Sequence, residues 1–171
     1  MKQIIPATLE DAVALNALVN SAYRGESGKQ GWTTEADLID GARIDVDGMA
    51  DILKDPLATI LKYVENEKIL ACVELIREED KLYLGMLTVS PVLQGKGIGK
   101  ELLRAAEQEA LKQNYNTIVM QVISVRQELI DWYVRHGYID TGKRKPFHFT
   151  ESRFGQPKQQ LEFVILEKKI K

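Results

Sequence analysis

The chain has 171 residues, of which 44% are hydrophobic and 28% charged, the composition of an ordinary folded protein. The 23 basic and 25 acidic residues leave a net charge of −2, so no overall field favours nucleic acid. One cysteine and two histidines exclude a disulfide framework and the usual structural zinc cluster, which predicts a cytoplasmic protein without a metal site. With no apolar stretch of about 18 residues and too short an N-terminal apolar run for a signal peptide, we expect neither a membrane partner nor secretion.

The N-terminal third predicts one strand followed by helices. Ile4 and Ile5 form a short strand that Pro6 stops, and Thr8 can cap a helix with acidic residues in its first turn. The polar, glycine-broken segment 24–55 predicts two short helices, 35–40 and 47–54, in a long connection of the kind that often covers a site.

The rest of the chain alternates strands with amphipathic helices. Three apolar runs joined by tight polar turns predict an antiparallel meander: 58–64, 69–76 and 81–89. A helix over 98–113, a strand over 117–123, a helix over 126–136 ended by Gly137, a long polar loop and a last strand over 161–168 follow. We expect an α/β (α+β) fold, with residues 1–171 forming a single domain around one sizeable core.

A glycine-rich segment separates the third strand of the meander from the helix that follows. It reads Gln94-Gly95-Lys96-Gly97-Ile98-Gly99-Lys100. Three alternate glycines remove side chains from the loop, so backbone amides at the helix N-terminus can close on phosphate oxygens, while two lysines add positive charge. The dinucleotide pattern needs a glycine at position 100, and the P-loop pattern needs Gly at 94 and Ser or Thr at 101, so neither fits. The alternative is a turn whose glycines only let strand and helix pack closely.

Two motifs resemble those of the Gcn5-related N-acetyltransferase (GNAT) superfamily. Gln94-x-x-Gly97-x-Gly99 resembles its Q/R-x-x-G-x-G/A motif, and the segment from Trp132 and Tyr133 to Gly137 and Tyr138 is similar to its aromatic-Tyr-x-x-x-Gly-aromatic segment. The motifs stand in the family's order, and the resemblance covers essentially the whole chain. It implies a mixed, mostly antiparallel sheet flanked by helices, with a splayed pair of cofactor-binding strands.

The resemblance also implies where acetyl-CoA binds. The co-substrate would lie against Leu87, Thr88 and Val89, with its pyrophosphate on the amides from Gln94 to Lys100. The strand 82–89 would carry a bulge, for which Gly85 is a candidate, and would splay from the strand 117–122; a plain glycine in a crowded strand is the alternative. Arg126 stands where many members have an asparagine that contacts the cofactor, so it is either a polar contact of cofactor or substrate or an exposed first-turn arginine.

The chemistry that the resemblance implies is direct transfer of an acetyl group to a primary amine. A backbone N–H near Leu87 or Thr88 can stabilise the developing oxyanion. Tyr133 occupies the family position of the general acid, and a phenol with a pKa near 10 is protonated at neutral pH. Its alternative role is an aromatic packed on an amphipathic helix. Glu74 is the candidate general base, and the alternative is an outward-facing polar residue of an alternating strand.

The remaining expectations concern packing, the acceptor and other functions. Cys72 should be a small buried hydrophobe, and His136 should end its helix. The region around Trp32 either shapes the acceptor site or contributes aromatic packing to the core. The loop around His148 either lines the acceptor pocket or is a solvated turn. The acceptor would be a small-molecule or peptide amine, and a homodimer would suit the family. A non-catalytic acyl-CoA-binding regulator, an acyltransferase with another donor, and an interaction module with a structural glycine loop stay open.

Overall fold

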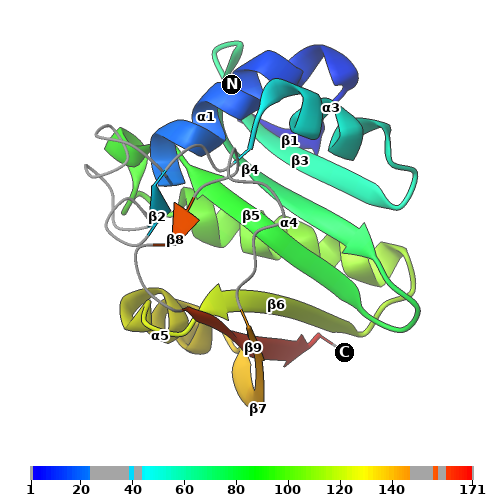
Figure 1. Cartoon of the computed structure of the whole chain (residues 1–171). Helices are drawn as coiled ribbons and strands as arrows, with labels where there is room; N and C mark the ends of the chain where they lie inside the picture. The colour runs from blue at the N-terminus through cyan, green and yellow to red at the C-terminus, as the bar shows by residue number, and fades with distance from the viewer. Residues whose placement is uncertain (1, 24–38, 41–43, 147–155, 158–160, 171) are drawn as a thin grey trace.

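The computed structural model describes residues 2–23, 39–40, 44–146, 156–157 and 161–170 (Figure 1). The N-terminal elements are β1 (Lys2–Pro6), a 3-10 turn (Leu9–Asp11), α1 (Ala12–Tyr23), β2 (Ile39–Asp40), α3 (Val46–Lys54), β3 (Ala58–Glu65), β4 (Lys68–Arg77) and β5 (Leu82–Val89). The C-terminal elements are a 3-10 turn (Pro91–Leu93), α4 (Ile98–Lys112), β6 (Thr117–Ile123), α5 (Gln127–Arg135), β7 (Ile139–Pro146), β8 (Gln156–Pro157) and β9 (Glu162–Lys169).

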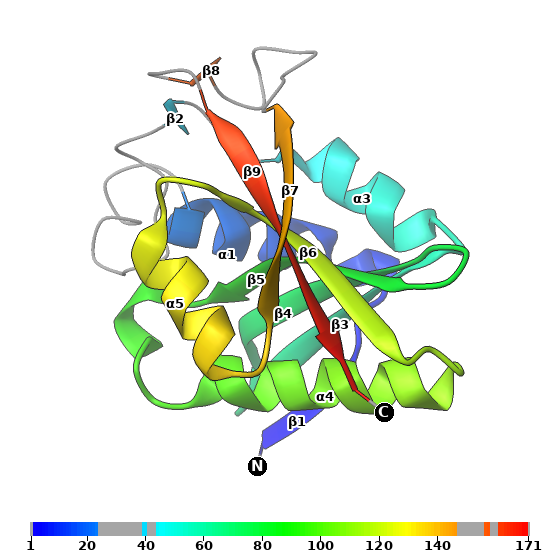
Figure 2. The same ribbon diagram turned by 90° about the horizontal axis from the view of Figure 1, so that it is seen from below.

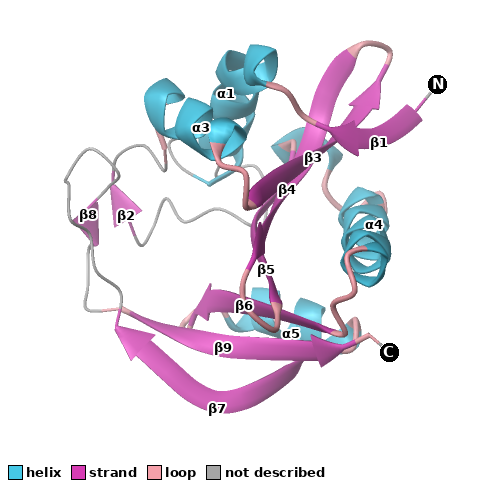
Figure 3. Cartoon of the chain, turned by 90° about the vertical axis from the view of Figure 1, so that its right-hand side faces the viewer, coloured by secondary structure: helices cyan, strands magenta, loops and turns pink. Residues whose placement is uncertain are grey.

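Within the described residues, seven strands form one sheet in the order β1-β3-β4-β5-β6-β9-β7. The pairing is antiparallel throughout except between β5 and β6, which run parallel. Helices α1 and α3 lie on one side of the sheet and α4 on the other (Figure 3). The predicted mixed, mostly antiparallel sheet flanked by helices is therefore confirmed.

Each helix packs on the sheet through an apolar stripe at helical spacing. In α1 the stripe Leu15, Leu18, Val19 and Ala22 is buried in one core cluster, together with residues of α3, β3, β4 and the bulged part of β5. In α4 the stripe is Ile98, Leu102, Ala106 and Ala110, which belongs to the larger cluster on the opposite face. Two cores thus sandwich β4 and β5, which explains why β5 is apolar along nearly its whole length.

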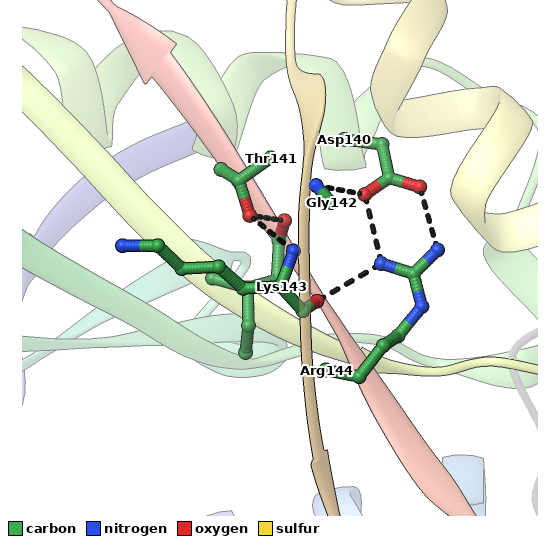
Figure 4. Close-up of polar contacts among 6 residues, drawn as sticks. Asp140, Thr141, Gly142, Lys143 and Arg144 are labelled. Carbon is green, nitrogen blue, oxygen red and sulfur yellow. Dashed lines mark hydrogen bonds and ion pairs between the residues drawn. The ribbon is translucent and has the colours of Figure 1, made fainter.

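Strand β7 is an element that the sequence pattern did not predict. The segment was expected to be part of a long polar loop, but Ile139–Pro146 pairs with β9 at the edge of the sheet. Nearly every residue of β7 is exposed, so it carries no apolar alternation. Two extra residues are accommodated where Asp140 accepts hydrogen bonds from the Gly142 amide and from the Arg144 guanidinium, which also holds the pKa of Asp140 below its ordinary value (Figure 4).

The long connection after α1 also differs from expectation in part. The prediction of a helix over 35–40 is wrong for its last two residues, because Ile39–Asp40 forms a short antiparallel pair with Gln156–Pro157. The helix expected over 47–54 is confirmed as α3, which Asp45 caps by accepting a hydrogen bond from the Gly48 amide at 2.7 Å. Residues Trp32 and His148 lie outside the described part of the chain. None of the helices in that part has the length and apolar character that crossing a membrane requires.

Candidate functional site

The sheet opens between β5 and β6. Both strands are fully described, and they pair at Leu82–Ile118 and Tyr83–Val119. Beyond these two pairs the strands diverge (Figure 2). An ion pair of 2.7 Å between Lys81 Nζ and Glu167 Oε2 of β9 lies beside the closed end. The splayed strand pair that the resemblance implied is therefore present.

A bulge in β5 lies beside the opening. Cys72 of β4 pairs with Thr88 and Glu74 pairs with Gly85, so β5 fits one more residue than β4 into the same interval. The backbone turns through a left-handed conformation at Met86, with φ of 50°. The expected position of the irregularity at Gly85 is thus one residue too early. Gly85 instead provides space, since a Cβ there would lie 2.8 Å from Cε1 of Tyr83.

A cavity of about 560 Å³ lies between the end of β5, the start of α4 and one face of α5. Its wall contains several of the expected residues: Leu87, Val89, Gln94, Gly95, Gly97, Ile98, Gly99, Lys100 and Tyr133. Leu93, Glu128, Leu129, Asp131, Trp132, Arg135 and His136 complete the wall. The volume falls within the range of about 300–1,000 Å³ that is usual for small-molecule and cofactor sites.

The glycine-rich segment forms one part of the cavity wall. Gly95 and Gly97 have φ of 86° and 83°, and a Cβ on either would meet nothing within 4 Å. Gly97 is the N-cap of α4, so the first amides of this helix have no partner within the helix itself. Amides of this kind, at the positive end of a helix dipole, are suited to binding anionic groups.

The side chains of this segment have distinct positions. The Gln94 carboxamide donates a hydrogen bond of 3.1 Å to the Val89 carbonyl and so closes the turn between strand and loop. Lys96 and Lys100 are exposed, and Lys100 belongs to the cavity wall. Gly99 faces α5, because a Cβ there would lie 3.3 Å from the Trp132 ring. The motif thus brings a strand, a loop and two helices together around one opening.

Helix α5 places an aromatic wall opposite the glycine-rich segment. Tyr133 is 5% exposed, and its ring makes edge contacts with Trp132 and Tyr138 at centroid distances of 5.1 and 5.8 Å. Leu129 and Ile130 are buried beside it, because the apolar face of α5 packs on the larger core. The phenol of Tyr133 therefore belongs to a fixed side chain.

Trp132 and His136 are cavity residues whose role in the wall the sequence did not indicate. His136 is the C-cap of α5, as predicted, and its Nδ1 donates to the Trp132 carbonyl at 2.7 Å. The two rings lie 4.3 Å apart between centroids. A spacing of four residues places Trp132 and His136 on the same face of α5. This spacing is the signal in the sequence that could have identified them.

Four expected residues lie away from this wall as far as the described residues form it: Glu74, Thr88, Lys96 and Arg126. Glu74 is half-buried and pairs with Gly85, on the strand face that carries Cys72 toward α1 and α3. Arg126 is half-buried at the N-cap of α5. Cys72 is fully buried, which confirms its assignment as a small core residue. No group of metal-ligating side chains is found among the described residues.

Tyr138, from the second motif, lies under the site rather than in its wall. It is 1% exposed, and its hydroxyl finds no hydrogen-bond partner among the described residues. Burial raises the pKa of Tyr138 well above its usual range, and the nearby carboxylate of Glu107 adds to the effect. The phenol of Tyr138 is therefore neutral at pH 7, and its ring supports Tyr133 through an edge contact.

The arrangement suits an elongated ligand with phosphates at one end and a less polar arm. Amides at the start of α4 can bind the phosphates, and Leu87, Val89 and Trp132 offer apolar contact to the arm where β5 has left β6. Coenzyme A and its thioesters have this combination of groups.

Comparisons with known proteins agree with this geometry. The family model described as "Acetyltransferase (GNAT) domain" matches residues 39–151. The fold is similar to that of an N-acetyltransferase from Staphylococcus aureus Mu50, with a TM-score of 0.76, 17% identity, and coverage of 99% of this chain and 98% of that one. The ribosomal-protein-S18-alanine N-acetyltransferase from Escherichia coli gives a TM-score of 0.74 at 15% identity, with coverage of 99% and 94%.

A third structure, yncA from Salmonella typhimurium with its cofactor acetyl-CoA, gives a TM-score of 0.72 at 19% identity, covering all of this chain and 95% of that one. At these identities the likeness shows the fold, while the family model covers well over half of the sequence. The chain therefore belongs to the GNAT acetyltransferase family.

Proposed function

We propose that this protein is an acetyl-CoA-dependent N-acetyltransferase that moves the acetyl group directly to a primary amine. The observation that carries the proposal is the cavity of about 560 Å³, because its wall combines the glycine-rich start of α4, the end of β5 beyond its pairing with β6, and Tyr133. A structural neighbour with its cofactor acetyl-CoA supports the choice of co-substrate. Another, named for an alanine of a ribosomal protein, supports a peptide amine as one class of acceptor beside small-molecule amines.

The residues divide into binding and chemical roles in this proposal. Amides from Gln94 to Lys100 bind the pyrophosphate, with Lys96 and Lys100 adding charge, and Leu87, Thr88 and Val89 contact the arm. A β5 amide near the bulge stabilises the oxyanion as the C–N bond forms and the C–S bond breaks. Tyr133 donates its proton to the departing sulfur, and the amine loses one proton to solvent or to Glu74 through water. Arg126 is a candidate contact for polar groups of cofactor or substrate.

Binding is tested by thermal melting with acetyl-CoA at 100 times its Kd, with NADH and ATP as controls. Such saturation adds about 2.7 kcal/mol to the free energy of unfolding, which raises the Tm of a chain of this length by about 5 to 10 °C. A shift with acetyl-CoA alone supports the cofactor assignment. No shift rejects both the enzyme and an acyl-CoA-binding regulator, and favours an interaction module.

Chemistry is tested by following thiol release with a panel of amines. Tyr133→Phe should lower kcat by about 100-fold or more with little change in KM for acetyl-CoA, because a general acid typically contributes 10²–10⁴-fold. Tyr115→Phe is the matched control, since the Tyr115 hydroxyl donates to the Glu78 carbonyl outside the cavity wall. Full kcat in Tyr133→Phe across the pH range rejects the acid role. Binding without turnover on any amine favours the regulator, and turnover only with a longer acyl-CoA favours another donor.

We also propose that residues 1–171 act as one domain in the cytoplasm, where the buried thiol of Cys72 stays reduced. Gel filtration distinguishes a monomer from the homodimer that the resemblance suggests.

A further inference from the structure

The bulge in β5 decides which side chains reach the cavity. Leu82 and Leu84 point into the larger core cluster, on the α4 side of the sheet. A regular strand would then send Leu87 and Val89 to the opposite face, because side chains alternate along a strand. The extra residue at the bulge reverses this order, so Leu87 and Val89 join the α4 side while Met86 packs with α1 and α3. The apolar wall of the cavity thus depends on the bulge.

The bulge rests on an unfavourable backbone conformation. Met86 has φ of 50°, a region in which residues with a Cβ are rarely found and which glycine adopts far more easily. Such a conformation persists only where neighbouring interactions hold it. Gly85, which could have taken the left-handed position, lies next to it under the Tyr83 ring.

Thr88 supplies an interaction that holds the bulge. Its side chain is fully buried, and its hydroxyl donates a hydrogen bond of 2.9 Å to the carbonyl of Met86, two residues back. Thr88 pairs with Cys72 in β4 and is not part of the described cavity wall, although Leu87 and Val89 on either side of it are. The hydroxyl therefore spans the bulge on the face of the strand away from the cavity.

We propose that Thr88 is a positioning residue for acetyl-CoA binding, whose buried hydroxyl fixes the left-handed turn at Met86 and so keeps Leu87 and Val89 in the cavity wall. The inference rests on the proposed function, because its readout is the affinity for acetyl-CoA. It adds to the backbone contact proposed for Thr88 a separate role for the side chain.

The test compares Thr88→Val, which keeps the shape and removes the hydroxyl, with Thr88→Ser, which keeps the hydroxyl and removes a methyl group. We expect Thr88→Val to raise the Kd for acetyl-CoA at least tenfold in calorimetric titration, and its KM correspondingly, while Thr88→Ser stays within threefold. Thr117→Val is the matched control, since Thr117 is also buried and its hydroxyl bonds Asn116 at the other end of the sheet. Its Kd should stay within twofold of wild type.

A second background separates positioning from general destabilisation. In a Met86→Gly protein the left-handed turn needs less support, so adding Thr88→Val there should raise the Kd by less than threefold. This pair also serves if Thr88→Val alone does not fold. Equal Kd values for wild type and Thr88→Val, or a tenfold loss that persists with Met86→Gly, overturn the proposal while leaving the proposed function intact. Wild-type protein that does not bind acetyl-CoA overturns the proposed function and this inference with it.

Discussion

Replacing Gly97 with alanine tests whether the start of α4 holds the phosphates of acetyl-CoA. Gly97 has φ of 83° at the N-cap, and a Cβ there would meet nothing within 4 Å. The substitution therefore adds no steric clash inside the protein. Its cost comes from the left-handed backbone, about 1–2 kcal/mol for a residue with a Cβ, less about 0.4–1 kcal/mol regained from the unfolded chain. A net loss of about 1 kcal/mol lowers the Tm by about 2–4 °C.

The same substitution at Gly142 provides a matched control. Gly142 has φ of 84°, also with nothing within 4 Å of a Cβ, but it lies in the bulged edge strand β7. Gly142→Ala should therefore lose as much Tm as Gly97→Ala while keeping the affinity for acetyl-CoA. In Gly97→Ala the methyl group stands beside the amides, and relaxation of the strained residue turns them away, so the Kd should rise at least tenfold.

The measurement is a pair of thermal melts and a calorimetric titration for each variant. Equal Kd values for Gly97→Ala and Gly142→Ala would show that the amides of the glycine-rich segment do not bind the phosphates. A Tm loss at Gly97 far above that at Gly142 would show that backbone strain alone does not describe the site.

Two further predictions concern stability. Tyr138→Phe should raise the Tm by about 2–12 °C, because it removes a buried hydroxyl that finds no partner among the described residues, and a buried unsatisfied group costs about 1–3 kcal/mol. A lower Tm in a thermal melt would contradict this. Asp11→Asn should cost about 1–3 kcal/mol at pH 7, because Asp11 accepts hydrogen bonds of 2.8 Å from Lys62 Nζ and from the Thr8 amide. Burial raises the pKa of Asp11, but the bonds from Lys62 and Thr8 outweigh it and leave the pKa lowered. The stabilisation is therefore complete above the ordinary pKa of 3.8 and is lost as the pH falls through the lower folded-state pKa, so urea unfolding curves of variant and wild type should converge in acid. A difference that stays constant down to acid pH would contradict the assignment.

The sequence predicted those elements whose side chains follow a clear apolar period. Helices α1 and α4 and strands β3 to β6 bury one stripe or both faces, and periodicity reports such burial directly. The sequence pattern did not predict β7, because this exposed edge strand has no apolar alternation. It is held by backbone pairing with β9 and by the Asp140–Arg144 contacts. The local hydrophobic pattern of a segment does not indicate whether its backbone pairs with a strand some twenty residues away.

The candidate site was predictable where the motif is a property of the backbone. Three glycines at a helix start predict an anion site, with a turn for close packing as the alternative, and the structure brings them into one cavity with Tyr133. The bulge was expected at Gly85 because glycine tolerates irregular backbone, yet the left-handed residue is Met86. Its position depends on a hydrogen bond from Thr88 and on packing against α1 and α3, which only the folded chain contains.

The short joint between β5 and β6 gives the sheet a mechanical property that a continuous ladder lacks. Four strands lie on one side of the joint and three on the other, and within the described residues two residue pairs connect them. The two parts of the sheet meet at the pairs Leu82–Ile118 and Tyr83–Val119 and separate beyond them. Within the described residues, a change in the angle between the two parts would disturb these two pairs and no other main-chain pairing of the sheet. Beyond these two pairs, the two parts are joined by the Lys81–Glu167 ion pair and by the larger core cluster, which contains side chains from β3, β4 and β5 and from β6 and β9. The width of the cleft is therefore set by side-chain packing rather than by main-chain pairing.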